Sequence, residues 1–130
     1  MMKPAKDSLD VGILVSDIEA SLNFYQKILG LEFLEKRPLW FGTMYPLRFG
    51  SSDLKLIVPN SKPEKGSVGL ESQLGFRYVT FVIKNLSDLC LELHRKGIVF
   101  VLPEKEIRPG VRIAMVEDPD GNIVEFVERS

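Results

Sequence analysis

Short apolar runs and amphipathic stretches alternate along this chain in an order that occurs twice. The first copy, VGILVSDIEASLNFYQKILGLEF (residues 11–33), passes from an apolar run through an amphipathic stretch to a glycine and a second apolar run. The second copy, VTFVIKNLSDLCLELHRKGIVF (residues 79–100), has the same order. Short β-branched runs predict strands, and apolar residues three to four positions apart predict a helix with one buried face. The sequence therefore predicts a duplicated unit.

Each amphipathic stretch also carries signals for the start and the end of a helix. Ser16 and Glu19 have the spacing of a capping box, and Asn85 is suited to cap the second helix. Gly30 and Gly97 suit the position after the last helical residue, where a positive φ is common. The predicted apolar stripes are Ile18, Leu22, Tyr25 and Leu29 in the first helix and Leu86, Cys90 and Leu93 in the second.

The remaining apolar runs predict three more strands in each copy. They lie near residues 31–37, 41–49 and 53–58, and near residues 98–103, 110–117 and 122–128. Each copy then reads as a β-α-β-β-β module, the first over residues 8–59 and the second over residues 75–129. We expect an α+β fold, a single domain of residues 1–130 whose curved mixed sheets enclose a cup. Residues 60–74 are rich in Ser, Gly, Lys and Pro, which predicts a linker or a lid.

Strand alternation indicates which side chains face this cup. In the last strand of each module, alternate apolar side chains are expected to pack under the helix. Lys55 and Glu125 then point to the opposite, concave face at equivalent positions of the two modules. The same alternation in the first strand of each module adds Asp10 and Tyr78. These four side chains are predicted to converge on one cup.

Composition and charge exclude several kinds of partner. The formal net charge is −1, so nothing indicates binding to nucleic acid or to an anionic membrane. No apolar run approaches the roughly 20 residues that a membrane span needs, and the first ten residues lack the apolar region of a signal peptide. The single cysteine, Cys90, has no partner for an internal disulfide. We expect a cytoplasmic protein.

Two motifs resemble those of the vicinal oxygen chelate superfamily, which includes glyoxalase I, methylmalonyl-CoA epimerase, extradiol dioxygenases and bleomycin resistance proteins. They are S-D-x-x-x-S-x-x-F-Y with a following L-G in the first copy, and D-P-D-G-N-x-x-E in EDPDGNIVEF (residues 117–126). The resemblance covers about residues 9–127 and implies a homodimer. It also implies metal ligands, commonly His, Glu or Gln, at the four cup positions. Only Glu125 matches, because Asp10, Lys55 and Tyr78 replace the usual residues.

The residues themselves argue against a metal in the cup. The chain has a single histidine, His94, so one chain cannot form a two-histidine site. A lysine ammonium ~4 Å from a divalent ion is repelled by several kcal/mol. The favoured hypothesis is a largely metal-free cup, in which Lys55 takes the place of the metal and pairs with Glu125 and Asp10. The alternative is a divalent ion (magnesium, manganese, nickel or zinc) held by Asp10 and Glu125.

Three functional hypotheses follow, and the sequence leaves open whether the protein is an enzyme. The first is a glyoxalase/bleomycin-resistance-like protein that binds a small organic molecule. The second is a lyase or isomerase of the glyoxalase/epimerase type, with Glu125 as base or metal ligand and Lys55 and Tyr78 as further catalytic candidates. The third is a non-catalytic dimeric module. The other ligand-binding candidates are Asp10, Trp40, Tyr45, Arg48, Arg77 and Arg112.

Each candidate residue also has a purely structural explanation. Glu125 and Lys55 could neutralise each other, or Lys55 could be an exposed edge lysine. Asp10 could begin a strand in solvent, and Tyr78 could line the cup without taking part in chemistry. The aromatic residues could belong to the core and the arginines to the surface.

Overall fold

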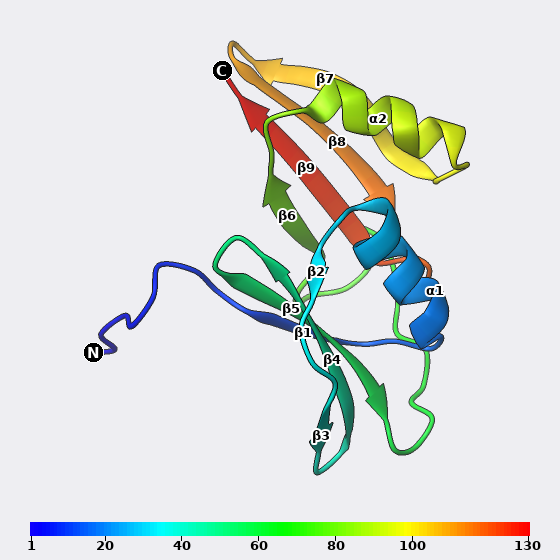
Figure 1. Cartoon of the computed structure of the whole chain (residues 1–130). Coiled ribbons are helices and arrows are strands. Elements are labelled where there is room, and N and C mark those ends of the chain that lie inside the picture. The colour runs from blue at the N-terminus through cyan, green and yellow to red at the C-terminus, as the bar shows by residue number, and fades with distance from the viewer. The chain divides into compact units, whose positions relative to one another are not determined.

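The computed structural model describes every residue of the chain, from Met1 to Ser130, as two compact units, Met1–Glu64 and Lys65–Ser130. Figure 1 labels the strands β1 to β9 and the helices α1 and α2. The first unit contains β1 (Val11–Leu14), α1 (Ile18–Leu22), η1 (Asn23–Ile28), β2 (Glu32–Phe33), β3 (Arg37–Leu39), β4 (Gly42–Phe49) and β5 (Ser52–Pro59). The second contains β6 (Tyr78–Val82), α2 (Leu86–Arg95), β7 (Phe100–Arg108), β8 (Val111–Glu117) and β9 (Ile123–Arg129).

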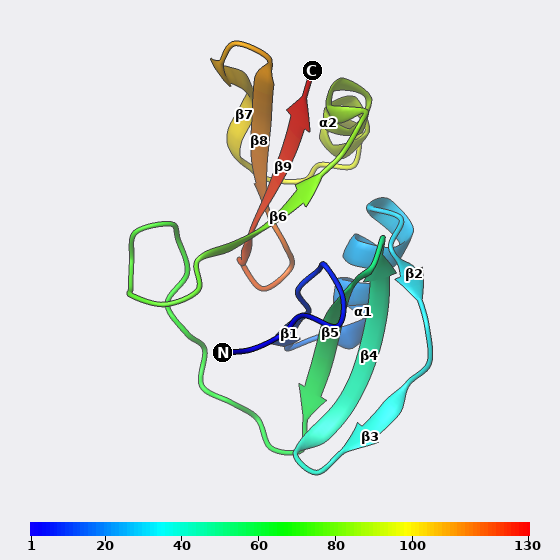
Figure 2. The ribbon, with the colours of Figure 1, turned by 90° about the vertical axis from the view of Figure 1, so that its left-hand side faces the viewer.

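The two units repeat one sheet topology. The strand order is β1-β5-β4-β2 in the first unit, where β3 also pairs with β4, and β6-β9-β8-β7 in the second. In each unit the first strand runs parallel to the last, and the remaining pairs are antiparallel. In each unit the helix packs on the sheet, with α1 against β5 and α2 against β7, β8 and β9 (Figure 2). The predicted α+β fold with mixed sheets is therefore confirmed.

The second helix buries the stripe that its sequence predicts. Leu86 and Leu93 are fully buried, and Cys90 is 5% exposed. The hydrogen bond expected from the Asn85 side chain is absent, although Asn85 does occupy the N-cap. Instead, the N–H of Leu86 donates to Oε1 of Glu128 at 2.8 Å, so a carboxylate of β9 caps this helix.

The first helix departs from the prediction in two ways. Its N-cap is Asp17, whose carboxylate accepts from the N–H of Ala20, so the predicted cap at Ser16 is wrong by one residue. The second half of the helix is a π-helix, in which the N–H of Leu29 donates to the carbonyl of Phe24. The wider turn rotates the buried face. Its buried side chains are Ser21, Phe24 and Tyr25, so Tyr25 alone of the predicted stripe is fully buried.

Two predicted strand boundaries also change. The strand expected at residues 31–37 is divided into β2 and β3, which pair with different parts of β4. The strand expected at residues 98–103 continues as β7 to Arg108, with register shifts against β8. Residues 60–77, which include the linker predicted at residues 60–74, contain no helix or strand. No helix is both long and apolar enough to cross a membrane.

Candidate functional site

Glu125 lies on the face of the second unit's sheet that points away from α2. Glu128, three residues later on β9, contacts the start of α2, which identifies the helix-covered face. Side chains alternate along the strand, so Glu125 points to the other face, which we call the open face. Glu125 pairs in register with Thr80 on β6 and with Met115 on β8. Tyr78, two residues before Thr80, shares this face and is 55% exposed.

The carboxylate of Glu125 is held by a neighbouring strand. The hydroxyl of Thr80 donates to its Oε1 at 2.7 Å. Most side chains around it are apolar, because Ile123 and Val127 flank it on β9 and Met115 faces it from β8; Glu117, in register with Ile123, shares this face. An apolar cluster continues along this face and comprises Val111, Ile113 and Val127 with Leu102 and Met115 packed against them. Glu125 is thus a half-buried carboxylate at the end of an apolar surface.

Lys55 occupies the equivalent place in the first unit. It pairs in register with Gly12 on β1 and with Pro46 on β4, as Glu125 pairs with Thr80 and Met115. It is half-buried and forms no ion pair within its unit. Since Gly12 has no side chain, Lys55 has open space beside it on this face; a Cβ at Gly12 would touch only Ile57, at 3.6 Å.

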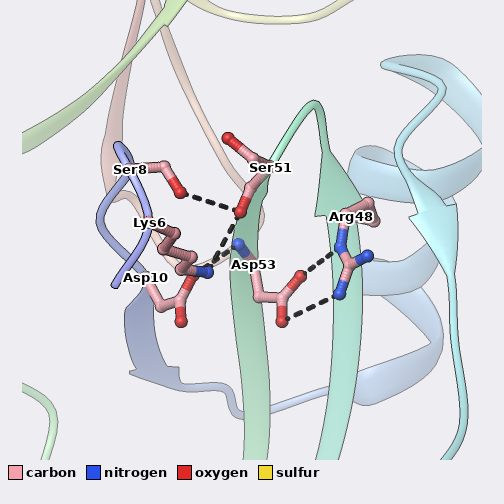
Figure 3. Close-up of polar contacts among 6 residues, drawn as sticks. All are labelled: Lys6, Ser8, Asp10, Arg48, Ser51 and Asp53. Atoms are coloured by element: carbon pink, nitrogen blue, oxygen red, sulfur yellow. Dashed lines mark hydrogen bonds and ion pairs between the residues drawn. The ribbon is translucent and has the colours of Figure 1, made fainter. Parts of the chain in front are cut away.

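Asp10 is engaged by protein groups at the edge of the same face (Figure 3). Its Oδ1 accepts from Nζ of Lys6 and from the N–H of Asp53, both at 2.8 Å. Lys6 and the hydroxyl of Ser8 also donate to the carbonyl of Ser51, which ties the N-terminal segment to the β4–β5 turn. The expected pair of Asp10 with Lys55 is therefore replaced by a pair with Lys6.

Arg48 forms a second ion pair beside this one (Figure 3). Its guanidinium contacts both carboxylate oxygens of Asp53, with 2.6 Å between Nε and Oδ1. The hydrogen bond from Arg48 lowers the pKa of Asp53 below the ordinary 3.8. The hydrogen bonds from Lys6 and from the Asp53 N–H, and lesser charge effects that include Lys55, lower the pKa of Asp10 in the same way. Each carboxylate on this edge thus has its own cation.

The other predicted arginines are engaged by protein groups of the second unit. Arg112 pairs with Glu104 and Glu128 on the helix side of the second unit, where it also donates to Ser87. Arg77 donates to the carbonyls of Ser67, Gly69 and Phe76 and to the hydroxyl of Ser72. The guanidinium of Arg77 therefore holds the end of the linker in a closed loop.

The predicted aromatic candidates also lie apart from Lys55. Trp40 is 90% exposed in the turn between β3 and β4, where its ring contacts that of Phe41. Tyr45 pairs in register with Leu56, which places it on the helix-covered face, and its ring stacks on that of Phe33.

The D-P-D-G-N turn is organised by its first residue, which the sequence analysis did not single out. Asp118 is 5% exposed, and its carboxylate accepts from the N–H groups of Asp120 and Asn122 and from the side-chain amide of Asn122. Gly121 has a φ of 85°, and a Cβ there would meet Val68 at 3.2 Å. A small pocket lies at this contact, lined by Ser67, Val68, Gly69, Phe76, Arg77, Gly121, Asn122 and Ile123.

Two polar partners on the open faces were also missed at the sequence level. Alternation places Thr80 on the same face as Glu125, but only the strand register puts the two directly opposite each other. Lys6 precedes the first strand and has no periodic signal at all. Within each unit, no three His, Cys, Asp or Glu side chains lie close enough together to hold a metal ion.

Comparison with known proteins identifies the family. The model of the Glyoxalase/Bleomycin resistance protein/Dioxygenase superfamily matches residues 9–126, and the chain belongs to this superfamily. A relative from Synechocystis sp., named "Probable lactoylglutathione lyase", is 28% identical over 124 residues, which are 91% of this chain and 92% of that protein. A lactoylglutathione lyase of Neisseria meningitidis is 26% identical over 121 residues, 88% of this chain and 85% of that protein.

Solved structures share the fold. TnmS3, an antibiotic binding protein from a Streptomyces species, superposes with a TM-score of 0.72 at 23% identity, covering 98% of this chain and all of that one. A glyoxalase family protein from Enterococcus faecalis superposes with a TM-score of 0.69 at 24% identity, covering 97% of both chains.

Proposed function

We propose that this protein binds a small organic molecule on the open faces of its sheets and holds no resident metal ion. The observation that carries the proposal is Lys55, a cation with no ion pair within its unit, at the position equivalent to Glu125. Proteins similar to this chain include an antibiotic binding protein of the same fold and several lactoylglutathione lyases, all named for small organic ligands or substrates. These names support an organic ligand without identifying it.

The donor chemistry of the first unit does not fit a divalent metal. Oδ1 of Asp10 already accepts two hydrogen bonds, one of them from a lysine. Lys55 adds a second cation close enough to lower the pKa of Asp10. A metal ion would have to displace Lys6 and approach Lys55, and each step costs electrostatic free energy. An organic ligand with an acceptor group would instead find an available ammonium donor in Lys55.

The experiment is a compound screen that is mapped onto the two open faces. The protein is titrated with a library of small aromatic and carboxylate-bearing compounds, and the perturbed amide resonances are assigned. We expect saturable binding that perturbs residues around Lys55 or Glu125. Lys55→Gln should weaken the binding of carboxylate-bearing compounds about threefold to tenfold. Lys36→Gln, on a loop away from β5, should not change their binding. Hits that perturb only the helix-covered faces would contradict the proposal.

A lyase or isomerase activity is the second candidate, and one observation favours it. Glu125 is a half-buried carboxylate with a single hydrogen-bond partner, Thr80, on an apolar face. A carboxylate in such a place can accept a proton from a carbon next to a carbonyl. If the protein is such an enzyme, Glu125→Gln removes turnover and leaves substrate binding in place. Turnover retained by Glu125→Gln would exclude Glu125 as the base.

Two further expectations are part of this proposal. A homodimer is expected from the family resemblance, and its measurement is sedimentation equilibrium of the purified protein. A cytoplasmic location is proposed because the single cysteine, Cys90, is a buried free thiol, as is usual in a reducing compartment.

A further inference from the structure

We infer that Thr80 is a positioning residue, which fixes Glu125 so that its second oxygen recognises a hydrogen-bond donor on an apolar ligand. This inference rests on the proposed function and names the ligand class for the second unit: an apolar or aromatic molecule that carries a hydroxyl or a protonated amine.

The geometry of the pair determines which oxygen remains available. Thr80 and Glu125 are direct register partners on two parallel strands, β6 and β9, so both side chains project from the same face. The Thr80 hydroxyl lies 2.7 Å from Oε1, and within the second unit no other side chain donates to the carboxylate. A carboxylate can accept about four hydrogen bonds. Oε2 is therefore an unused acceptor whose direction is set by Thr80.

No lysine or arginine of the second unit forms an ion pair with Glu125, although Lys105 and Arg129 share its face. The guanidinium of Arg77 donates to three carbonyls and one hydroxyl of the linker loop. Arg112 lies on the helix side with Glu104 and Glu128. A half-buried carboxylate with one neutral partner gains most from a ligand that donates a hydrogen bond.

The apolar neighbours define the rest of the ligand. Tyr78, Ile123 and Met115 surround Glu125 on this face, and the cluster of Ile113 and Val127 continues it. Ile123, Ile113 and Val127 are already buried, so an apolar body would remove from water mainly the exposed surface of Tyr78 and Met115, and so strengthen binding. A ligand with a carboxylate at the same end would meet the charge of Glu125 and be rejected.

Three probes of one shape separate these cases: benzylamine, benzyl alcohol and benzoate. Each is titrated into the full-length protein, and binding is followed by the amide resonances of Thr80, Glu125 and Ile123 and by the carbon resonance of the Glu125 carboxyl. We expect benzylamine and benzyl alcohol to bind at these residues and benzoate to bind at least tenfold more weakly there.

Matched substitutions test the role of Thr80 separately from its packing. Thr80→Val keeps the shape of the side chain and removes the hydroxyl, whereas Thr80→Ser keeps the hydroxyl. We expect Thr80→Val to weaken the binding of benzylamine and benzyl alcohol, the two donor probes, about threefold to tenfold. It should also shift the Glu125 carboxyl resonance in the free protein. Thr80→Ser should bind the donor probes with an affinity within about twofold of that of the unchanged protein. A purely structural role would lower stability without changing the preference for donor probes over benzoate.

The outcomes distinguish this inference from the proposed function. Donor probes that bind the open face equally well in Thr80→Val and Glu125→Gln would overturn the inference and leave the proposed function intact. Benzoate binding at Glu125 as tightly as benzylamine would also overturn it. If neither the probes nor the compound library perturbs the open face of either unit, the proposed function fails, and the inference fails with it.

Discussion

Asp10, directly before β1, lies beside Asp53 on β5, and the backbone N–H of Asp53 donates to the carboxylate of Asp10 at 2.8 Å. Two neighbouring carboxylates would repel each other, but each has its own cation, Lys6 for Asp10 and Arg48 for Asp53. This edge of the first unit is therefore a neutral network of alternating charges. Both carboxylates therefore pair with cations other than Lys55, and Lys55 forms no ion pair within its unit.

This network predicts how stability depends on pH. The carboxyl pKa values of Asp10 and Asp53 lie below the ordinary 3.8, so the unfolded chain binds these protons more readily than the folded protein does. Their contribution is present above that value and is lost as the pH falls through the folded pKa values. In urea unfolding between about pH 6 and pH 3, Asp53→Asn should lose less stability than the unchanged protein. Asp7→Asn, outside the network, is the control and should follow the unchanged protein.

Asp118 is predicted to be the most important polar residue of the D-P-D-G-N turn. Its buried carboxylate accepts three hydrogen bonds from Asp120 and Asn122, and Asp118→Ala leaves these donors without their acceptor. We expect a loss of about 2 to 3 kcal/mol in the free energy of unfolding. Glu35→Ala, at an exposed position, should change it by less than about 0.5 kcal/mol. Equal effects in the two variants would contradict this role for Asp118.

Arg77 is predicted to keep the linker closed. Leu74 and Phe76 are almost fully exposed in this loop, so chymotrypsin can cut there once the backbone opens. Arg77→Ala removes four hydrogen bonds, and cleavage between residues 70 and 77 should accelerate several-fold, with a smaller effect for Arg77→Lys. Arg95→Ala, on α2, serves as the control. Unchanged cleavage in Arg77→Ala would show that the loop is held by other contacts.

Cys90 is predicted to be chemically inert in the folded protein. It is 5% exposed, and burial is the main cause that raises the pKa of its thiol, so the reactive thiolate is scarce. His94, four residues later, stacks on the ring of Phe100 at 4.3 Å between centroids. A disulfide reagent should modify Cys90 only as fast as the protein unfolds. A Ser61→Cys variant, exposed in the linker, should react at once, and a similarly fast reaction of Cys90 in the unchanged protein would refute the prediction.

The sequence was sufficient for the repeated fold, because each module has its own periodic signals. Alternation in the last strands placed Lys55 and Glu125 on the open faces, since a period of two is unambiguous in a strand of this length. The glycines that end the two helices have the expected positive φ, 89° at Gly30 and 70° at Gly97.

Other features depend on contacts that no local pattern encodes. The π-helix at residues 23–28 changes the helical period, so its buried side chains are Phe24 and Tyr25, while Leu29 of the predicted stripe is half-buried. Thr80 and Glu125 are 45 residues apart in the sequence, so their pairing can be predicted only if the register between β6 and β9 is known. Lys6 reaches Asp10 because the chain before β1 folds back onto the β4–β5 turn, which no periodicity predicts.

The most direct test of the proposal that the protein holds no metal ion is calorimetric titration of the purified, metal-stripped protein with magnesium, manganese, nickel and zinc. If Lys55 takes the place of a metal, no ion should bind stoichiometrically with an affinity tighter than micromolar. Lys55→Glu, which replaces the cation with a carboxylate beside Asp10, should raise the affinity for at least one of these ions, while Lys36→Glu should not. Tight stoichiometric binding by the unchanged protein, abolished by Glu125→Gln, would contradict the metal-free account.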